Sequence, residues 1–229
     1  MKITSIMVTR ERPKYINRAV RSLVERVDDL DNYEVIVGFD ADDQRSIDSF
    51  NEFKEKELKD VNVVTYIFKE RYGWSRGHDY FNEQVKIANG DYIAMWADNF
   101  EMHTRNWDKI IRESYADKFC LVRTNILNGN CWLATNPIFP KKWSELLGRI
   151  TGPCLDLWMG VVAYELGIFV EDPRIMCSYH ALRGTAHHGQ ENYKFWDRRH
   201  IWEKDIEVLR EYIKSINQEP IIYPGPKPY

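Results

Sequence analysis

Acidic and amide side chains directly follow two apolar runs of the sequence. The residues concerned are Asp40, Asp42 and Asp43 after the first run, and Asp98 and Asn99 after the second. Carboxylates in such positions can accept hydrogen bonds from a nucleobase or a ribose, and Mg²⁺ and Mn²⁺ prefer oxygen ligands of this kind. Each group taken alone is also compatible with a solvated turn or a helix N-cap, since Asp and Asn favour both.

Further candidates for chemistry lie in the second half of the chain. Asp156 opens an apolar segment with helical character, where it can cap the helix or act as a general base. His180 follows a predicted late strand, and its neutral imidazole can complete a metal site, although a structural histidine is the commoner case. His187 and His188 stand in a polar segment, residues 183–190, for which we expect a loop.

The elements that position these residues alternate over the first part of the chain. Strands are predicted at residues 2–8, 33–39, 61–68 and 92–96, and helices at residues 15–27, 46–58 and 77–88. Such alternation with short connections favours βαβ units, and therefore an α/β fold with a mostly parallel central sheet flanked by helices. Ligands bind beyond the carboxyl ends of the strands in these sheets, so Asp40 and Asp98 should converge on one crevice.

The second half is less regular, and no linker in it divides the chain into separate domains. Helices are expected at residues 104–116, 141–147, 156–166 and 200–216, and a late strand at residues 173–176. The tail, residues 219–229, is rich in proline and should be extended.

Composition argues against several classes of protein. With 229 residues, of which 44% are hydrophobic and 29% charged, the chain is expected to fold around a core of its own. The net charge of -3 provides no overall basic field for nucleic acid, and no apolar run approaches the ~18 residues of a membrane span. The first residues lack the pattern of a signal peptide. The four cysteines form no Cys-x-x-Cys motif and are predicted to be reduced thiols in a cytoplasmic protein.

Taken in order, these segments resemble glycosyltransferase family 2, whose members have the GT-A fold. The similar segments are residues 8–15 (first loop and helix start), 35–43 (second strand and nucleotide-binding carboxylate), 74–82 (Arg-Asn-x-Gly region), 93–100 (place of the DxD signature), 104–108 (the segment after it), and 137–143 and 156–158 (acceptor half). Together they extend over residues 3–195.

The resemblance implies a single GT-A (Rossmann-like) domain that moves a sugar from a nucleotide sugar, most often a UDP-sugar, to an acceptor hydroxyl. Residues 1–100 would be the nucleotide-sugar-binding half, residues 101–218 the acceptor-binding half and residues 219–229 a tail. The donor-binding residues implied are Thr9, Arg12, Asp40, Asp42, Arg76 and Asp98. The ligands implied for Mn²⁺ or Mg²⁺ are Asp98, Asn99 and His180. Asp156 would be the general base of an inverting transfer.

Two departures from the family pattern leave alternatives open. Asn99 stands where the family has a second carboxylate, and Gly77-His78 where it has Asn. A catalytically inactive nucleotide- or sugar-binding module is therefore one alternative. A nucleotidyltransferase is disfavoured, because no glycine-rich phosphate loop follows the first strand. A third alternative concerns the acceptor, which would be a modified base in DNA, as in some phage glycosyltransferases, in place of a saccharide. Residues 141–142 and 198–200 could then contact the DNA phosphates, although the net negative charge argues against this acceptor.

Overall fold

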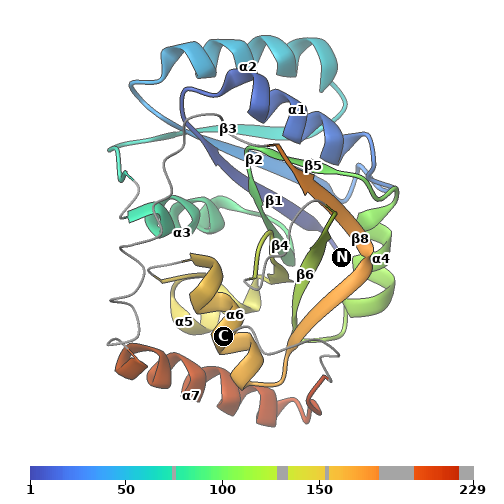
Figure 1. The fold of residues 1–229 in the computed structure, drawn as a ribbon, viewed down its shortest axis with the longest axis vertical. Helices are drawn as coiled ribbons and strands as arrows, with labels where there is room; N and C mark the ends of the chain where they lie inside the picture. Colours follow the sequence, from blue (N-terminus) through green and yellow to red (C-terminus); the bar gives the residue numbers. More distant parts are fainter. Residues whose placement is uncertain (74–75, 128–133, 153–154, 181–198, 222–229) are drawn as a thin grey trace.

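The computed structural model describes residues 1–73, 76–127, 134–152, 155–180 and 199–221, which arrange helices around one eight-stranded sheet (Figure 1). The strands are β1 (Ile3–Thr9), β2 (Tyr33–Asp40), β3 (Asn62–Phe68), β4 (Tyr92–Ala97), β5 (Phe100–Met102), β6 (Leu121–Ile126), β7 (Ile138–Pro140) and β8 (Phe169–Tyr179). The helices are α1 (Pro13–Val24), α2 (Gln44–Glu57), α3 (Gly77–Ile87), α4 (Trp107–Tyr115), α5 (Lys142–Leu147), α6 (Leu155–Glu165) and α7 (Arg199–Ser215). Figure 1 shows α1 and α2 on one side of the sheet and α3, α6 and α7 on the other.

The sheet is mixed, and the prediction of a mostly parallel sheet was wrong. Its strand order is β3-β2-β1-β4-β7-β6-β8-β5. The first four strands in the sequence pair in parallel, as their alternation with helices predicts. Among the remaining pairs, β4–β7, β6–β7 and β5–β8 are antiparallel and β6–β8 is parallel. β7 thus runs antiparallel to both of its neighbours, β4 and β6.

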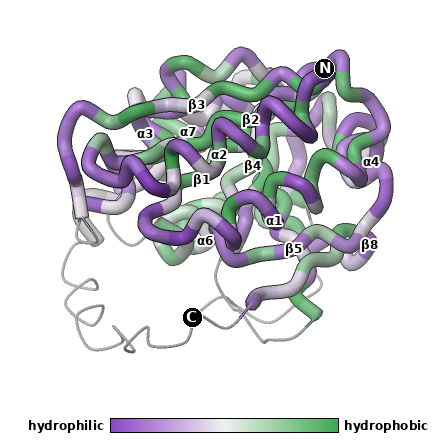
Figure 2. Tube along the Cα trace, turned by 90° about the horizontal axis from the view of Figure 1, so that it is seen from above, coloured by the Kyte–Doolittle hydropathy of each residue, from purple (hydrophilic) through white to green (hydrophobic). Residues whose placement is uncertain are grey.

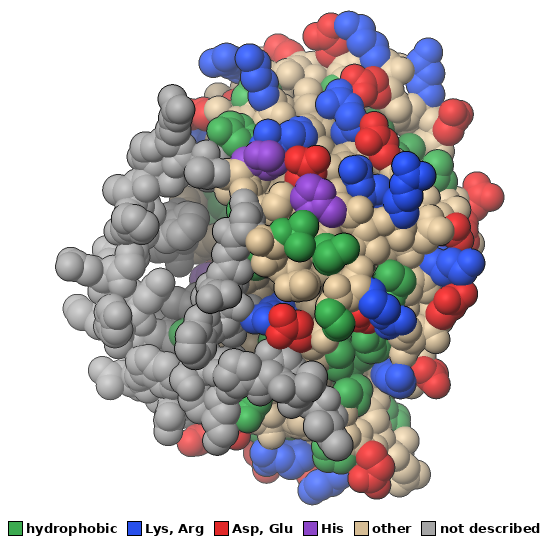
Figure 3. All heavy atoms as spheres, turned by 45° about the vertical axis from the view of Figure 1, so that its right-hand side comes forward, with side chains coloured by type: hydrophobic (Ala, Val, Ile, Leu, Met, Phe, Trp, Pro, Cys, Tyr) green, Lys and Arg blue, Asp and Glu red, His purple; other side chains and the backbone are tan. Residues whose placement is uncertain are grey.

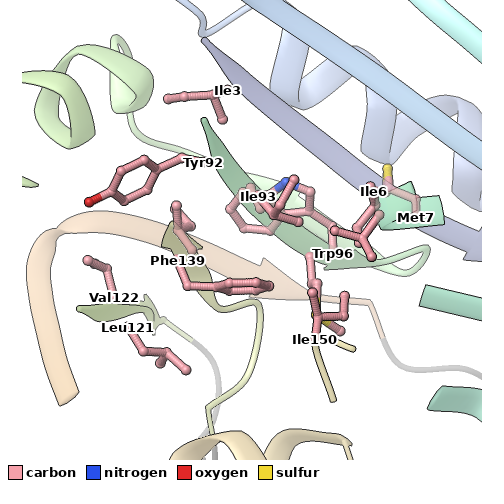
Figure 4. Close-up of a cluster of buried hydrophobic side chains, with 14 of the residues drawn as sticks. Ile3, Ile6, Met7, Tyr92, Ile93, Trp96, Leu121, Val122, Phe139 and Ile150 are labelled. Atoms are coloured by element: carbon pink, nitrogen blue, oxygen red, sulfur yellow. The ribbon is translucent and has the colours of Figure 1, made fainter. Parts of the chain in front are cut away.

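The core lies on both faces of the central strands. All eight residues of β2 are buried, which is typical of a strand covered by helices on each side. Trp96 of β4 and Phe139 of β7 lie in the same apolar cluster as Ile6 of β1 (Figure 4). Hydrophilic and hydrophobic positions alternate along α1 (Figure 2). The buried residues of α1 are Ile16, Ala19, Val20, Ser22 and Leu23.

The helix starts follow local chemistry. Pro13 occupies the first turn of α1, where its missing N–H costs no hydrogen bond. Asp43 caps α2 by accepting a hydrogen bond from the Ser46 N–H. α4 begins at Trp107 and not at residue 104 as predicted, because Asn106 is left-handed, with φ of 56°, and its N–H donates to the Arg26 carbonyl at 2.7 Å.

The cysteine prediction is confirmed for two of the four residues. Cys120 and Cys177 are free and buried, and burial raises the pKa of both thiols. Cys131 and Cys154 lie outside the described residues. No helix within the described ranges is long and apolar enough to cross a bilayer. The cytoplasmic location stays a prediction.

A buried carboxylate joins several elements at the edge of the sheet where β1, β2 and β4 begin. Glu34 is 1% exposed and accepts hydrogen bonds from the Thr4 hydroxyl at 2.7 Å and the Asn89 N–H at 2.9 Å. The side-chain amides of Asn62 and Asn89 donate to its other oxygen at 3.2 and 2.9 Å. Burial alone would raise the pKa of Glu34, but the bonds from Asn89 and Thr4 outweigh it and lower that pKa. The ionised form is therefore the one that stabilises the fold.

We expect Glu34→Gln to lower the free energy of unfolding by about 1–3 kcal/mol near neutral pH. The amide group of glutamine would replace one carboxylate oxygen, and its N–H groups would then face donors of Thr4, Asn62 or Asn89. A carboxyl with a lowered folded-state pKa stabilises above its unfolded pKa, and that stabilisation is lost as pH falls through the folded pKa. The difference between wild type and variant should therefore shrink with acidification. Urea unfolding over a pH series measures it, and a difference independent of pH would contradict this role.

Candidate active site

Three polar residues meet where the parallel strands end. β1 lies between β2 and β4, and all three run in the same direction. Thr9 closes β1, Asp40 closes β2 and Asp98 directly follows β4. Asp40 is 3% exposed and Asp98 is 6% exposed. Two largely buried carboxylates at one sheet edge need compensating donors, and the loop after β1 supplies them.

Asp98 is held by the loop after β1. The Thr9 hydroxyl donates to its Oδ2 at 2.8 Å, and Arg12 Nη1 donates to its Oδ1 at 3.2 Å. Burial raises the pKa of Asp98, and these two hydrogen bonds only partly oppose that shift. A positive charge close to Asp98, from a guanidinium or a cation, therefore favours the ionised carboxylate.

Asp40 connects two loops of the site. Arg10 Nη1 donates to its Oδ2 at 3.0 Å, and the Tyr80 hydroxyl of α3 donates to its Oδ1 at 2.7 Å. The same hydroxyl accepts hydrogen bonds from the N–H groups of Tyr72 and Gly73, at 3.0 and 3.2 Å. Burial, followed by the bond to Asp40, raises the pKa of Tyr80, so it remains a donor. The position of the chain before α3 is thus tied to the carboxylate at the end of β2.

Arg10 also forms a two-point ion pair with Asp42. Nη2 donates to Oδ2 at 2.9 Å, and Nη1 contacts Oδ1. Asp42 is exposed, and the hydrogen bond from Arg10 is the largest cause of its lowered pKa. Arg10 thereby bridges both carboxylates at the end of β2.

Asp43 fixes the backbone of the loop that carries Arg10 and Arg12. Its Oδ2 accepts a hydrogen bond from the Glu11 N–H at 2.6 Å, and its Oδ1 accepts one from the Ser46 N–H at 3.3 Å. Glu11 has a φ of 56°, which non-glycine residues rarely adopt. One carboxylate thus caps α2 and holds a left-handed residue in the loop after β1.

Two of the three residues predicted to bind a cation, Asn99 and His180, contact each other where β5 pairs with β8. The His180 N–H donates to the Asn99 carbonyl at 2.8 Å, and the Asn99 amide donates back to the His180 carbonyl at 3.0 Å. The His180 ring is 2.8 Å from Glu101 through Nε2, and this pairing lowers the pKa of Glu101. Histidine and acidic side chains lie together on this side of the molecule (Figure 3).

This donor set fits a cation only in part. Asp98 offers a carboxylate, Asn99 an amide oxygen and His180 an imidazole, all of them accepted ligand types. Both Asp98 oxygens already have protein donors, and His180 uses one nitrogen on Glu101. Among the described residues, no three His, Cys, Asp or Glu side chains are grouped to hold a metal. A cation here needs further oxygen ligands, which a diphosphate provides.

Arg76, which was also predicted to bind the donor, has partners other than the carboxylates at the strand ends. Arg76, just before α3, pairs with Asp79 at 2.7 Å and lies over the Tyr72 ring, 4.5 Å from its centroid. Within the described part of the chain, no hydrogen bond or ion pair joins Arg76 to Asp40 or Asp98.

Several predictions fall outside what the structure describes. Asp156 lies in the first turn of α6, as predicted, but its side chain is not described. His187, His188 and the whole segment 183–190 also lie outside the described residues.

Sequence reasoning missed three residues of this site. Arg10 directly follows a predicted strand, which was an available signal, but nothing in the sequence names its partners. Tyr80 occupies an unremarkable helical position, and Glu101 lies two residues beyond Asn99 without a motif of its own. Tyr80 contacts Asp40, which is 40 positions away in the sequence, and Glu101 contacts His180, which is 79 positions away.

The sequence of this chain matches a known family. The model described as Glycosyl transferase family 2 matches residues 4–163. The chain belongs to this family. No sequence among the curated proteins matches it.

The fold is similar to that of several solved structures, among them the following three. The mannosyltransferase PcManGT from Pyrobaculum calidifontis, in complex with GDP-Man and Mn²⁺, has a TM-score of 0.66 at 14% identity, covering 96% of this chain and 66% of that one. S. aureus TarS 1-349, in complex with UDP-GlcNAc, has a TM-score of 0.64 at 14% identity, covering 90% of this chain and 66% of that one. Another TarS structure has a TM-score of 0.59 at 16% identity, covering 79% and 37%. The family 2 chain therefore has the GT-A fold and spans about two thirds of these proteins or less.

We expect Asp43→Ala to lower the free energy of unfolding by about 1–2 kcal/mol, because it removes the cap of α2 and the acceptor of the Glu11 N–H. Asp43→Asn retains one acceptor oxygen and should recover most of the cap contribution. Urea unfolding of the two variants measures the difference. Wild-type stability of Asp43→Ala would show that neither contact matters.

Proposed function

We propose that this family 2 chain transfers a sugar, with inversion, from a nucleotide-sugar donor to an acceptor hydroxyl, and that the donor is a UDP-sugar. The observation that carries the proposal is the convergence of Thr9, Asp40 and Asp98 where β1, β2 and β4 end. Ligands of open α/β sheets bind at such an edge, and family membership makes a nucleotide sugar the fitting ligand. The similar structures hold GDP-Man and UDP-GlcNAc, so GDP is the nucleotide to compare with UDP.

The donor would lie across the ends of three strands. Its nucleoside would bind Asp40 and Asp42, whose carboxylates accept hydrogen bonds from a base N–H or a ribose hydroxyl. Its diphosphate would lie toward Arg12 and Asp98, with Thr9 between the two groups. Arg76, on the exposed turn before α3, would contact the diphosphate or the sugar. In this proposal residues 1–100 bind the donor and residues 101–218 bind the acceptor.

We include a divalent cation, Mn²⁺ or Mg²⁺, in the proposal. Asp98, Asn99 and His180 would hold it together with oxygens of the donor, because their own donor set is incomplete. When bound, the cation supplies positive charge that stabilises the leaving diphosphate. Arg12, already 3.2 Å from Asp98, contributes a second positive charge at the same place.

The proton of the acceptor hydroxyl would pass to Asp156. The residue lies in the first turn of α6, beyond the donor half of the sequence. As that proton leaves, the hydroxyl oxygen would attack the anomeric carbon from the side opposite the diphosphate. The bond between that carbon and the diphosphate oxygen breaks, the nucleoside diphosphate departs, and the configuration is inverted. The acceptor would be a saccharide or a modified DNA base, both of which present a free hydroxyl.

Asp40→Ala and Asp98→Ala should each weaken UDP binding about tenfold or more, because each removes an acceptor at one end of the nucleotide. The Asp98 variant should also lose most of the gain in affinity that Mn²⁺ gives. Calorimetry with UDP and with GDP, each with and without Mn²⁺, measures these effects and identifies the base.

Asp48→Ala, an exposed carboxylate on α2, is the matched control and should leave affinity unchanged. Wild-type affinity in both site variants would contradict the proposed donor site, and tighter binding of GDP than UDP would correct the donor.

Asp156→Asn should lower the rate of sugar transfer about 10²-fold or more while leaving UDP affinity and stability close to wild type, because Asn can cap a helix but cannot accept the proton. The assay follows release of UDP in the presence of an acceptor that the wild type uses. Asp117→Asn, an exposed site before β6, is the control. Wild-type turnover of Asp156→Asn would mean that the base is another residue.

A further inference from the structure

Arg10 occupies the carboxylates that the nucleoside is proposed to use. Its guanidinium bonds to Asp40 at 3.0 Å and to both oxygens of Asp42, while Tyr80 takes the remaining oxygen of Asp40. Every oxygen of these two carboxylates thus accepts a hydrogen bond from the protein. A nucleoside that binds Asp40 and Asp42 must compete with a charged, two-point ion pair.

The order of the strands places Arg10 on the path of the diphosphate. Arg10 is the first residue after β1, and β1 lies between β2, which ends at Asp40, and β4, which precedes Asp98. A nucleotide that reaches from Asp40 to Asp98 therefore crosses the end of β1. A guanidinium that leaves Asp40 and Asp42 would meet the phosphate groups there, beside the exposed Glu11 carboxylate that Nη2 already approaches at 3.4 Å.

The backbone around Arg10 is held while its side chain is able to turn. The Glu11 N–H is bound to Asp43, and the side chain of Arg12 is bound to Asp98. The Arg10 side chain is 26% exposed, and its long stem can reorient without moving the loop. An exchange of partners by Arg10 needs no change in the fold.

We propose that Arg10 makes the site selective for nucleoside diphosphates over nucleosides by exchanging partners. When a nucleotide binds, the guanidinium leaves Asp40 and Asp42 for the diphosphate, and the nucleoside takes the released carboxylate oxygens. A nucleoside without phosphates must break the same ion pairs and offers Arg10 nothing in return. This inference rests on the proposed donor site and adds to it a specificity-determining residue.

The test compares Arg10→Gln with wild type in calorimetric binding of uridine and of UDP, and of guanosine and GDP, at one ionic strength. Loss of the competing ion pair should tighten nucleoside binding about threefold to fivefold. Loss of the charged phosphate contact should weaken diphosphate binding about tenfold. The preference of the site for diphosphate over nucleoside should therefore fall by roughly 30-fold to 50-fold.

Arg21→Gln is the matched control. Arg21 forms the same two-point pair with Glu57, at 2.8 and 2.7 Å, on the outer surface of α1 and α2. Its loss should leave all four affinities unchanged. Arg10→Lys retains the charge but not the two-point geometry, so it should tighten nucleoside binding while keeping most of the affinity for diphosphate.

Three results would overturn the inference. Equal weakening of nucleoside and diphosphate in Arg10→Gln would make Arg10 a support of the nucleoside contact and not its competitor. Unchanged affinities in both Arg10 variants would remove Arg10 from the site. A wild type that binds neither UDP nor GDP would refute the proposed donor site itself, and the inference with it.

Discussion

The arrangement of the site depends on the parallel pairing of β2, β1 and β4. Parallel strands end at the same edge, so the carboxylates after β2 and β4 must lie near each other. Both are largely buried, and two buried negative charges are unfavourable without nearby donors. The short loop after the middle strand carries Arg10 and Arg12, which supply that compensation from one place. The strand order that brings the two carboxylates together therefore also places the two arginines that compensate their charge.

At the opposite edge of the sheet another buried carboxylate, Glu34, is also compensated by nearby donors. Glu34 is buried, accepts hydrogen bonds from neutral donors and lies 4.0 Å from the Lys2 ammonium, and it links β1, β2, β3 and the turn before β4. Its donors Asn62 and Asn89 are exposed but uncharged, whereas Asp42 is held by the charged guanidinium of Arg10. Carboxylates at both ends of these strands thus depend on donors from neighbouring segments.

The second half of the chain changes the character of the sheet and extends the site. The antiparallel pairing of β5 with β8 brings His180 beside Asn99 from 81 residues away. This pairing interrupts the simple parallel pattern, and it joins His180 to one of the two other residues proposed to hold a cation. The ring of His180 is hydrogen-bonded to Glu101, so any ligand of that ring binds next to a carboxylate.

The sequence alone determined the strands and helices of the first half and the positions of Asp40 and Asp98 at strand ends. Hydrophobic periodicity and turn chemistry are local, and the parallel arrangement follows from short alternating connections. Only the tertiary structure decided that the sheet is mixed, that Arg10 bridges Asp40 and Asp42, that Tyr80 completes Asp40 and that His180 faces Glu101. These outcomes depend on which side chains meet across 30 to 79 positions of sequence, and no local pattern encodes such a partner. The physical reason is that a hydrogen-bond partner is chosen by proximity in the folded chain, after the strands have paired.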